Sequence, residues 1–138
     1  MFLLDTNVVS ELRRRDKTDP RVSAWSDAIP PDDLFLAAVT VLELEAGVLT
    51  MERRDTAQGA VLRRWLDNKV LPSFSGRILP VDTAIALRCA RLHVPNPKPE
   101  RDAMIAATAL VKHLTVVTRN VSDFQQMGVD LLNPWNAS

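Results

Sequence analysis

Four acidic residues stand far apart along the chain, each in a short segment that could place it at a metal site: Asp5, Glu43, Asp102 and Asp123. Carboxylates without cysteine or histidine partners suit Mg²⁺ or Mn²⁺ better than zinc. One or two such ions can activate water and stabilise the leaving oxygen during in-line attack on a phosphodiester. These residue types therefore predict a metal-dependent nuclease in which the four carboxylates bind metal, provided that the fold brings them together.

Each of these residues also has an ordinary structural explanation. Asp5 begins the triplet Asp-Thr-Asn, whose residue types are preferred as helix caps. Glu43 stands three residues after Thr40 and completes a Ser/Thr-x-x-Glu capping box. Asp102 falls in the first turn of a predicted helix, where the helix dipole favours a negative charge. Asp123 precedes an aromatic residue, so it could be a turn carboxylate beside a core anchor.

Polar residues next to the acidic ones could orient the carboxylates or the substrate through hydrogen bonds: Thr6, Asn7, Thr118 and Asn120. Asn120 and Asp123 could each contribute an oxygen to the site, and both alternatives stay open. Gly47 lies one turn after Glu43 on the same helix face, although glycine inside a helix costs about 1 kcal/mol relative to alanine. We expect it to permit the close approach of another backbone or of a substrate.

Length and composition indicate one globular domain over residues 1–138, because 138 residues with 46% hydrophobic content suffice for one core. The 17 basic and 17 acidic residues exclude a strongly cationic nucleic-acid binder. A local basic rim around an acidic centre is compatible with this balance, although each basic cluster is more simply a solvated helix face. The candidates for the rim are Arg13, Arg14, Arg15, Lys17, Arg53, Arg54, Arg63, Arg64, Lys98 and Arg101.

Nothing in the sequence predicts export or membrane insertion. The apolar runs are interrupted well before the ~18 residues that a membrane-spanning helix needs. The opening Met-Phe-Leu-Leu-Asp lacks the basic lead-in of a secretory signal. The single cysteine, Cys89, cannot form an internal disulfide, and its apolar neighbours favour a small buried residue over a nucleophile. We expect a cytoplasmic protein.

Apolar runs alternate with amphipathic segments along the chain. We predict strands at 2–5, 34–39, 77–81, 115–118 and 129–132, and helices at 7–14, 20–28, 40–53, 56–70, 82–92 and 100–113. Asp19 and Asp82 are expected to cap their helices. Apolar strands separated by helices indicate an α/β fold with a largely parallel sheet covered on both faces. Ligands of such sheets bind at the carboxyl ends of the strands, where Asp5 and residues 118–120 would lie.

In their order and spacing, five segments resemble the PIN-domain family, and within it the VapC and FitB-like toxins of bacterial toxin–antitoxin pairs. They are Leu-Leu-Asp5-Thr-Asn, Glu43-Leu-Glu-Ala-Gly, Asp102-Ala-Met-Ile-Ala-Ala, Thr118-Arg-Asn-Val-Ser-Asp-Phe and Asn133-Pro-Trp. The resemblance runs from residue 1 to about residue 135. It implies a PIN-like three-layer sandwich, with a mostly parallel central sheet flanked by helices.

The resemblance also implies an Mg²⁺- or Mn²⁺-dependent endoribonuclease in which Asp5, Glu43 and Asp102 are the acidic metal-binding positions. It further implies toxicity through cleavage of structured RNA such as tRNA or rRNA, homodimers, and larger complexes with a small antitoxin that blocks the site and binds promoter DNA. Members of the family often carry Asp where this chain has Asn120. The fourth acidic role is therefore absent, taken by Asn120 as a neutral ligand, or supplied by Asp123.

Two other functions compete with this interpretation. A phosphotransferase of the haloacid dehalogenase type also begins with a strand and an Asp. Such enzymes carry Asp-x-Asp, however, and Asn7 here leaves the general acid missing. A PIN-like protein that only binds or regulates a partner would need no three convergent carboxylates, which argues against it.

Overall fold

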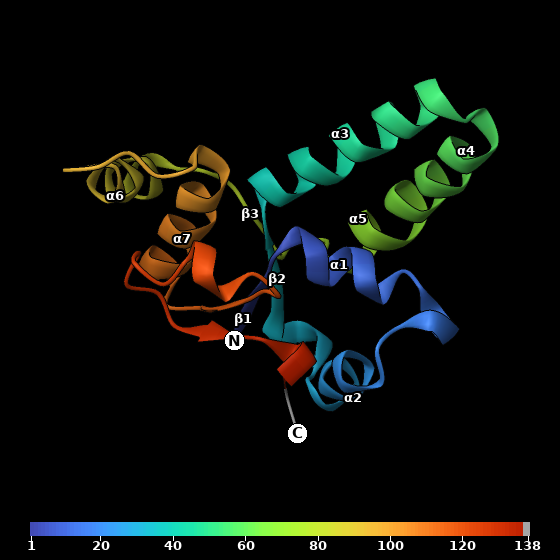
Figure 1. The fold of residues 1–138 in the computed structure, drawn as a ribbon, viewed down its shortest axis with the longest axis horizontal. Helices are drawn as coiled ribbons and strands as arrows, with labels where there is room; N and C mark the ends of the chain where they lie inside the picture. Colours follow the sequence, from blue (N-terminus) through green and yellow to red (C-terminus); the bar gives the residue numbers. More distant parts are fainter. Residues whose placement is uncertain (137–138) are drawn as a thin grey trace.

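The fold is built on a five-stranded sheet in which every neighbouring pair of strands is parallel (Figure 1). The computed structural model describes residues 1–136, with the side chain of Arg15 left out. The strands are β1 (Phe2–Leu4), β2 (Leu34–Ala37), β3 (Ile78–Leu79), β4 (Thr115–Val117) and β5 (Leu131–Leu132), in the order β3-β2-β1-β4-β5. The predicted parallel sheet is confirmed. Its central strand β1 lies beside β4, where the strand order changes direction.

Seven α-helices connect the strands within the described residues: α1 (Thr6–Leu12), α2 (Pro20–Ala28), α3 (Ala38–Arg54), α4 (Thr56–Trp65), α5 (Leu71–Ser73), α6 (Thr83–Leu92) and α7 (Glu100–Lys112). Asp19 and Asp82 cap α2 and α6 as predicted, through bonds from backbone N–H groups to their carboxylates. A π-helical turn at Leu66–Val70 joins α4 to α5. The predicted helix at 56–70 therefore continues, and Pro72 lies in the first turn of α5, where a proline is tolerated.

The strands have apolar side chains on both faces of the sheet. Leu4 and Val117 point into one core with residues of α1, α2 and α3, whereas Leu3 and Val116 point into a second core with Ile105 and other residues of α7. In Figure 1 the sheet accordingly lies between α6 and α7 on one side and α1 to α5 on the other. The expected three-layer sandwich is confirmed, and burial on both faces explains why the strands lack alternating polar residues.

Helices α3 and α4 form an antiparallel hairpin that extends away from the sheet (Figure 1). The two helices approach closely at Gly59, where an added Cβ would lie 2.5 Å from the Glu52 Cα. The Arg63 guanidinium of α4 reaches both oxygens of Glu45 at 2.7 Å and both oxygens of Glu52 at 3.2 and 3.3 Å. A glycine contact and a buttressing ion-pair network thus fix the position of α4 against α3.

Helix α6 packs less deeply than expected. Ile85 is buried, but Leu87 is 66% exposed and Cys89 is only half-buried, so the prediction of a buried cysteine is wrong. Most of the helix surface is open because α6 makes its main contacts with α7 alone. Across residues 1–136, no helix combines the length and apolar character needed to cross a bilayer.

Candidate active site

Asp5 occupies the carboxyl end of the central strand, where its backbone N–H donates to the Val117 carbonyl of β4 at 2.9 Å. The side chain is buried, and both carboxylate oxygens accept hydrogen bonds. Oδ1 accepts from the Thr6 N–H at 2.8 Å. Oδ2 accepts from the Thr118 hydroxyl at 2.8 Å and from the Asn7 amide at 3.2 Å. Asp5 is therefore a fixed acceptor at the end of the sheet that parallel α/β folds use for ligands.

Thr118, which directly follows β4, joins the two segments of the site. Its hydroxyl donates to Asp5, 113 residues away in sequence, and accepts from the Asn7 amide at 3.2 Å and from the Asn120 backbone N–H at 3.0 Å. Asn7 in turn accepts from the Arg119 N–H at 3.1 Å. The expected hydrogen bonds from Asn7 are present, and this network holds the ends of β1 and β4 in register.

Glu43 does not belong to a capping box, and that prediction is wrong. Helix α3 follows β2 directly and begins earlier, with Ala37 at its N-cap, so Thr40 is already inside the helix. Its hydroxyl is buried and has no hydrogen-bond partner among the described residues. Glu43 therefore lies in the second turn, where Oε1 accepts from the Thr6 hydroxyl at 2.8 Å and Oε2 lies 3.8 Å from the Arg101 guanidinium. Without a capping role, its orientation toward Thr6 has no other local explanation.

Asp102 lies in the first turn of α7, as predicted. Burial, together with the nearby charges of Asp5, Asp123 and Glu43, raises the pKa of its carboxyl from an ordinary value of 3.8 to about 6. Charges act on a pKa only over short distances, so the fold places the other three carboxylates near that of Asp102.

The gathered carboxylates do not yet form a ligand shell. In residues 1–136, no three acidic, histidine or cysteine side chains lie close enough together to hold one ion. The donors nevertheless fit Mg²⁺ or Mn²⁺ chemically, since they are carboxylates that a bound ion could draw together. Their role as metal ligands stays a prediction.

The fourth position is placed by a short helical turn after β4. Asp123 ends the 3-10 turn Val121–Asp123. Its carboxylate is exposed and close enough to raise the pKa of Asp102. Asn120 is tied to Thr118 through its backbone N–H. The electrostatic contact favours Asp123 as the fourth acidic residue, while Asn120 as a neutral ligand remains an untested alternative.

Three of the basic residues predicted for the rim form ion pairs. Arg14 pairs with Glu11 at 3.1 Å, and Arg63 is bound by carboxylates of the α3–α4 hairpin, so these two are structural. Arg101 contacts Glu43 and lies at the site. Arg119 was missed by the sequence analysis, although it directly follows Thr118 in Thr-Arg-Asn. Its guanidinium lies 5.1 Å from the centroid of the Trp135 ring, at the rim of the site.

Gly47 has a different role from the one expected. A Cβ added there would meet nothing within 4 Å, so no backbone approaches this glycine and that part of the prediction is wrong. Gly47 instead lines an open hollow together with Thr6 and Glu43. The other part of the prediction, that Gly47 leaves space for a substrate beside Glu43, stays a prediction.

Comparison with known proteins identifies the family. The family model described as PIN domain matches residues 2–129. This chain belongs to the PIN-domain family. It is 38% identical to Toxin FitB of Neisseria gonorrhoeae, with 99% of each chain covered, and 37% identical to VapC ribonuclease Y4jK of Sinorhizobium fredii, with 98% of each covered.

Solved structures agree with this assignment. The crystal structure of FitAcB from Neisseria gonorrhoeae contains a chain that superposes on this PIN domain with a TM-score of 0.89 at 38% identity, covering 99% of both chains. The resemblance to VapC and FitB-like toxins stated from the sequence is thereby confirmed.

Proposed function

We propose that this PIN-domain protein is a metal-dependent endoribonuclease and the toxin of a toxin–antitoxin pair. One observation carries the proposal: burial, together with the charges of Asp5, Glu43 and Asp123, raises the pKa of Asp102 to about 6. A scaffold that only bound a partner would gain nothing from three further carboxylates placed close to that of Asp102. A cation bound among them would remove the repulsion between them.

The residues that would hold Mg²⁺ or Mn²⁺ are Asp5, Glu43 and Asp102, with Asp123 as the fourth. When bound, the ion supplies positive charge that admits a phosphate to this acidic centre and promotes attack of water on the phosphodiester. The protein's own part is orientation. Hydrogen bonds to both carboxylate oxygens hold Asp5 in place, and the hydrogen bond from the Thr6 hydroxyl orients Glu43. Bonds of this kind around ligands typically change metal affinity by about 10–100-fold when lost.

Arg101 has a separate role in the proposed reaction. Its guanidinium is half-exposed and only 3.8 Å from Glu43, a loose ion pair at the edge of the acidic centre. From this edge the guanidinium would bind the phosphate of the substrate. Asp102 must lose its proton to join a cation, so metal binding should strengthen as the pH rises through about 6.

The proposal extends to partners and location. The names of the relatives, a toxin and a ribonuclease, support a toxin that acts on RNA, and we infer that a small antitoxin neutralises it. We infer that the substrate is structured RNA such as tRNA or rRNA, and that the protein acts in the cytoplasm as a homodimer. Larger complexes with the antitoxin would reach promoter DNA only through the antitoxin.

Cleavage assays with purified protein test the activity. RNA should be cut when Mg²⁺ or Mn²⁺ is present and left intact in EDTA. Asp5→Ala and Asp102→Asn should abolish cleavage while circular dichroism shows a folded protein. Asp27→Asn, which removes an exposed carboxylate on α2, is the matched control and should cleave as the wild type does. Mapping new RNA 5′ ends after expression in cells would identify the target.

Two results would overturn the proposal. If Asp5→Ala or Asp102→Asn cleaved RNA at the wild-type rate, the substituted residue would have no role in catalysis. Calorimetry that detects no binding of Mg²⁺ or Mn²⁺, together with RNA that is bound and never cut, would support the alternative of a binding protein without catalytic activity.

A further inference from the structure

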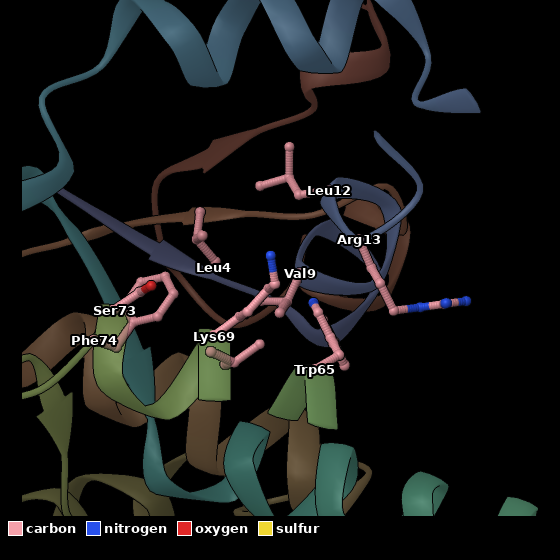
Figure 2. A pocket seen from close by; sticks show the side chains of 9 residues that line it. Leu4, Val9, Leu12, Arg13, Trp65, Lys69, Ser73 and Phe74 are labelled. Atoms are coloured by element: carbon pink, nitrogen blue, oxygen red, sulfur yellow. The ribbon is translucent and has the colours of Figure 1, made fainter. Parts of the chain in front are cut away.

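Three adjoining hollows lie between α1 and the segment from α4 to α5. The first, about 150 Å³ in volume, is the one drawn in Figure 2. The second opens beside Arg64, and the third reaches Thr6 and Glu43 of the candidate active site. Arg13 and Trp65 line all three, so the hollows adjoin one another. We call this feature the α1–α4 groove, defined by Arg13, Arg64, Trp65 and Lys69; it leads from the acidic centre across the protein surface.

The first two hollows carry only positive charge. Arg13, Arg64 and Lys69 are among their lining residues, and no acidic residue is. None of these three cations has a carboxylate within 4 Å in the described part of the chain, whereas Arg14 and Arg63 are paired with glutamates. In a protein of zero net charge, unpaired cations concentrated in one groove indicate an anionic ligand.

Trp65 gives the groove an aromatic surface. The other two tryptophans have partners of their own: Trp25 packs edge-on against Phe2, and Trp135 is buried beneath Arg119. Trp65 is half-buried and lines the hollows, with the Arg13 guanidinium 5.8 Å from its ring centroid. In Figure 2 its side chain lies between those of Arg13 and Lys69. An indole beside unpaired cations is the combination that single-stranded nucleic acids require, because bases stack on the ring while phosphates meet the charges.

We propose that the α1–α4 groove binds an unpaired nucleotide of the RNA strand adjoining the bond cut at the acidic centre. The base stacks on Trp65 and takes the place of the Arg13 guanidinium, which turns to a neighbouring phosphate. Arg64 and Lys69 hold the phosphates further along the strand. This inference rests on the proposed ribonuclease function and adds to it a requirement: a base within a duplex has no free face for Trp65, so the strand leaving the site must be unpaired.

Binding measured in EDTA separates this step from cleavage. The probe is a fluorescein-labelled single-stranded RNA of mixed sequence, titrated with wild-type protein and variants. Trp65→Leu should weaken binding by roughly 5- to 150-fold, the usual effect of losing one stacked base. Arg64→Gln combined with Lys69→Gln should make the slope of log K against log salt shallower by about 1.4, since each phosphate contact on a single strand contributes about 0.7.

Matched controls exclude trivial explanations. Arg53→Gln combined with Arg54→Gln removes two charges at the far end of α3 and should leave the slope unchanged. Tryptophan fluorescence should be quenched by single-stranded RNA in the wild type and in Trp25→Phe, and the quenching should be lost in Trp65→Leu. A duplex of the same sequence should cause no quenching that depends on Trp65. The charge variants are exposed substitutions, so they test the groove even if Trp65→Leu fails to fold.

The outcomes distinguish the two proposals. If the wild type cleaves RNA but all groove variants bind the single-stranded probe unchanged, the groove proposal is wrong and the ribonuclease proposal stands. The same conclusion follows if these variants weaken only the binding of a protein partner. If the probe binds with the expected dependence on Trp65 but no RNA is ever cut, the groove proposal stands and the ribonuclease proposal fails.

Discussion

Replacing Asp102 by asparagine should stabilise the metal-free protein at neutral pH while abolishing its activity. The folded protein binds the Asp102 proton with a pKa of about 6, against an ordinary value of 3.8. Because the folded-state pKa is the higher one, the stability that Asp102 contributes is complete below about pH 4 and is lost as the pH rises through about 6. Above that range the folded wild type bears the full cost in stability of an ionised Asp102 carboxylate, and Asp102→Asn bears none of it.

The size of the effect follows from the same pKa values. A difference of about two pH units corresponds to roughly 3 kcal/mol, at about 1.4 kcal/mol for each unit. Asp102 is partly exposed, so solvent screening reduces this value, and we expect about 1–1.5 kcal/mol. At about pH 8 the variant should therefore unfold at a higher urea concentration than the wild type. Near pH 4 the advantage should disappear.

Urea unfolding in EDTA, followed by tryptophan fluorescence between about pH 4 and pH 8, measures this difference. Asp27→Asn is the control, because its carboxylate is exposed on α2 and forms no ion pair within residues 1–136. Adding Mg²⁺ or Mn²⁺ should raise the stability of the wild type and leave Asp102→Asn nearly unchanged. A variant that gains no stability at high pH, or one whose gain is the same at every pH, would refute the reasoning.

Three further predictions concern the helices and the orientation of Asp5. Gly47→Ala should stabilise the protein by about 0.5–1 kcal/mol because the added Cβ meets nothing, whereas Gly59→Ala should destabilise it because the added Cβ would clash with α3. Urea unfolding measures both changes in stability, and two changes in the same direction would contradict this packing. Thr118→Val should lower the affinity for Mn²⁺ about 10–100-fold in calorimetry, with the fold retained, because Asp5 loses a hydrogen-bond donor. An unchanged affinity would show that this hydroxyl does not orient Asp5 for metal binding. Arg63→Gln should cost about 1 kcal/mol in urea unfolding, less at high salt, and a cost independent of salt would argue against the ion-pair network.

Local sequence patterns predicted most strands and helices, because the forces that form these elements act between residues close in sequence. Alternating apolar runs and amphipathic segments gave the five strands and the helices between them, and Asp19 and Asp82 cap the helices that follow them. The errors occurred where long-range packing prevailed. The predicted capping box at Thr40 is wrong because β2 runs directly into α3, and the helix predicted to end at residue 70 continues through a π-helical turn into α5.

The same division applies to the candidate site. Sequence predicted Asp5, Glu43, Asp102 and Asp123 as residues able to do chemistry, because their residue types and surrounding segments are local properties. It could not assign the arginines, since Arg63 meets its partners on a neighbouring helix. Nor could it distinguish the two helical glycines, which look alike in sequence. Gly47 faces open space, whereas Gly59 faces the backbone of α3.

The sequence by itself determined the order of strands and helices, the family of the chain and the identity of its acidic residues. Only the tertiary structure decided which of these residues act on one another. Thr6 reaches Glu43 across 37 residues and Thr118 reaches Asp5 across 113, and no local pattern encodes contacts of that range. The raised pKa of Asp102 is likewise a product of the tertiary structure, because burial and the charges of three distant segments produce it together.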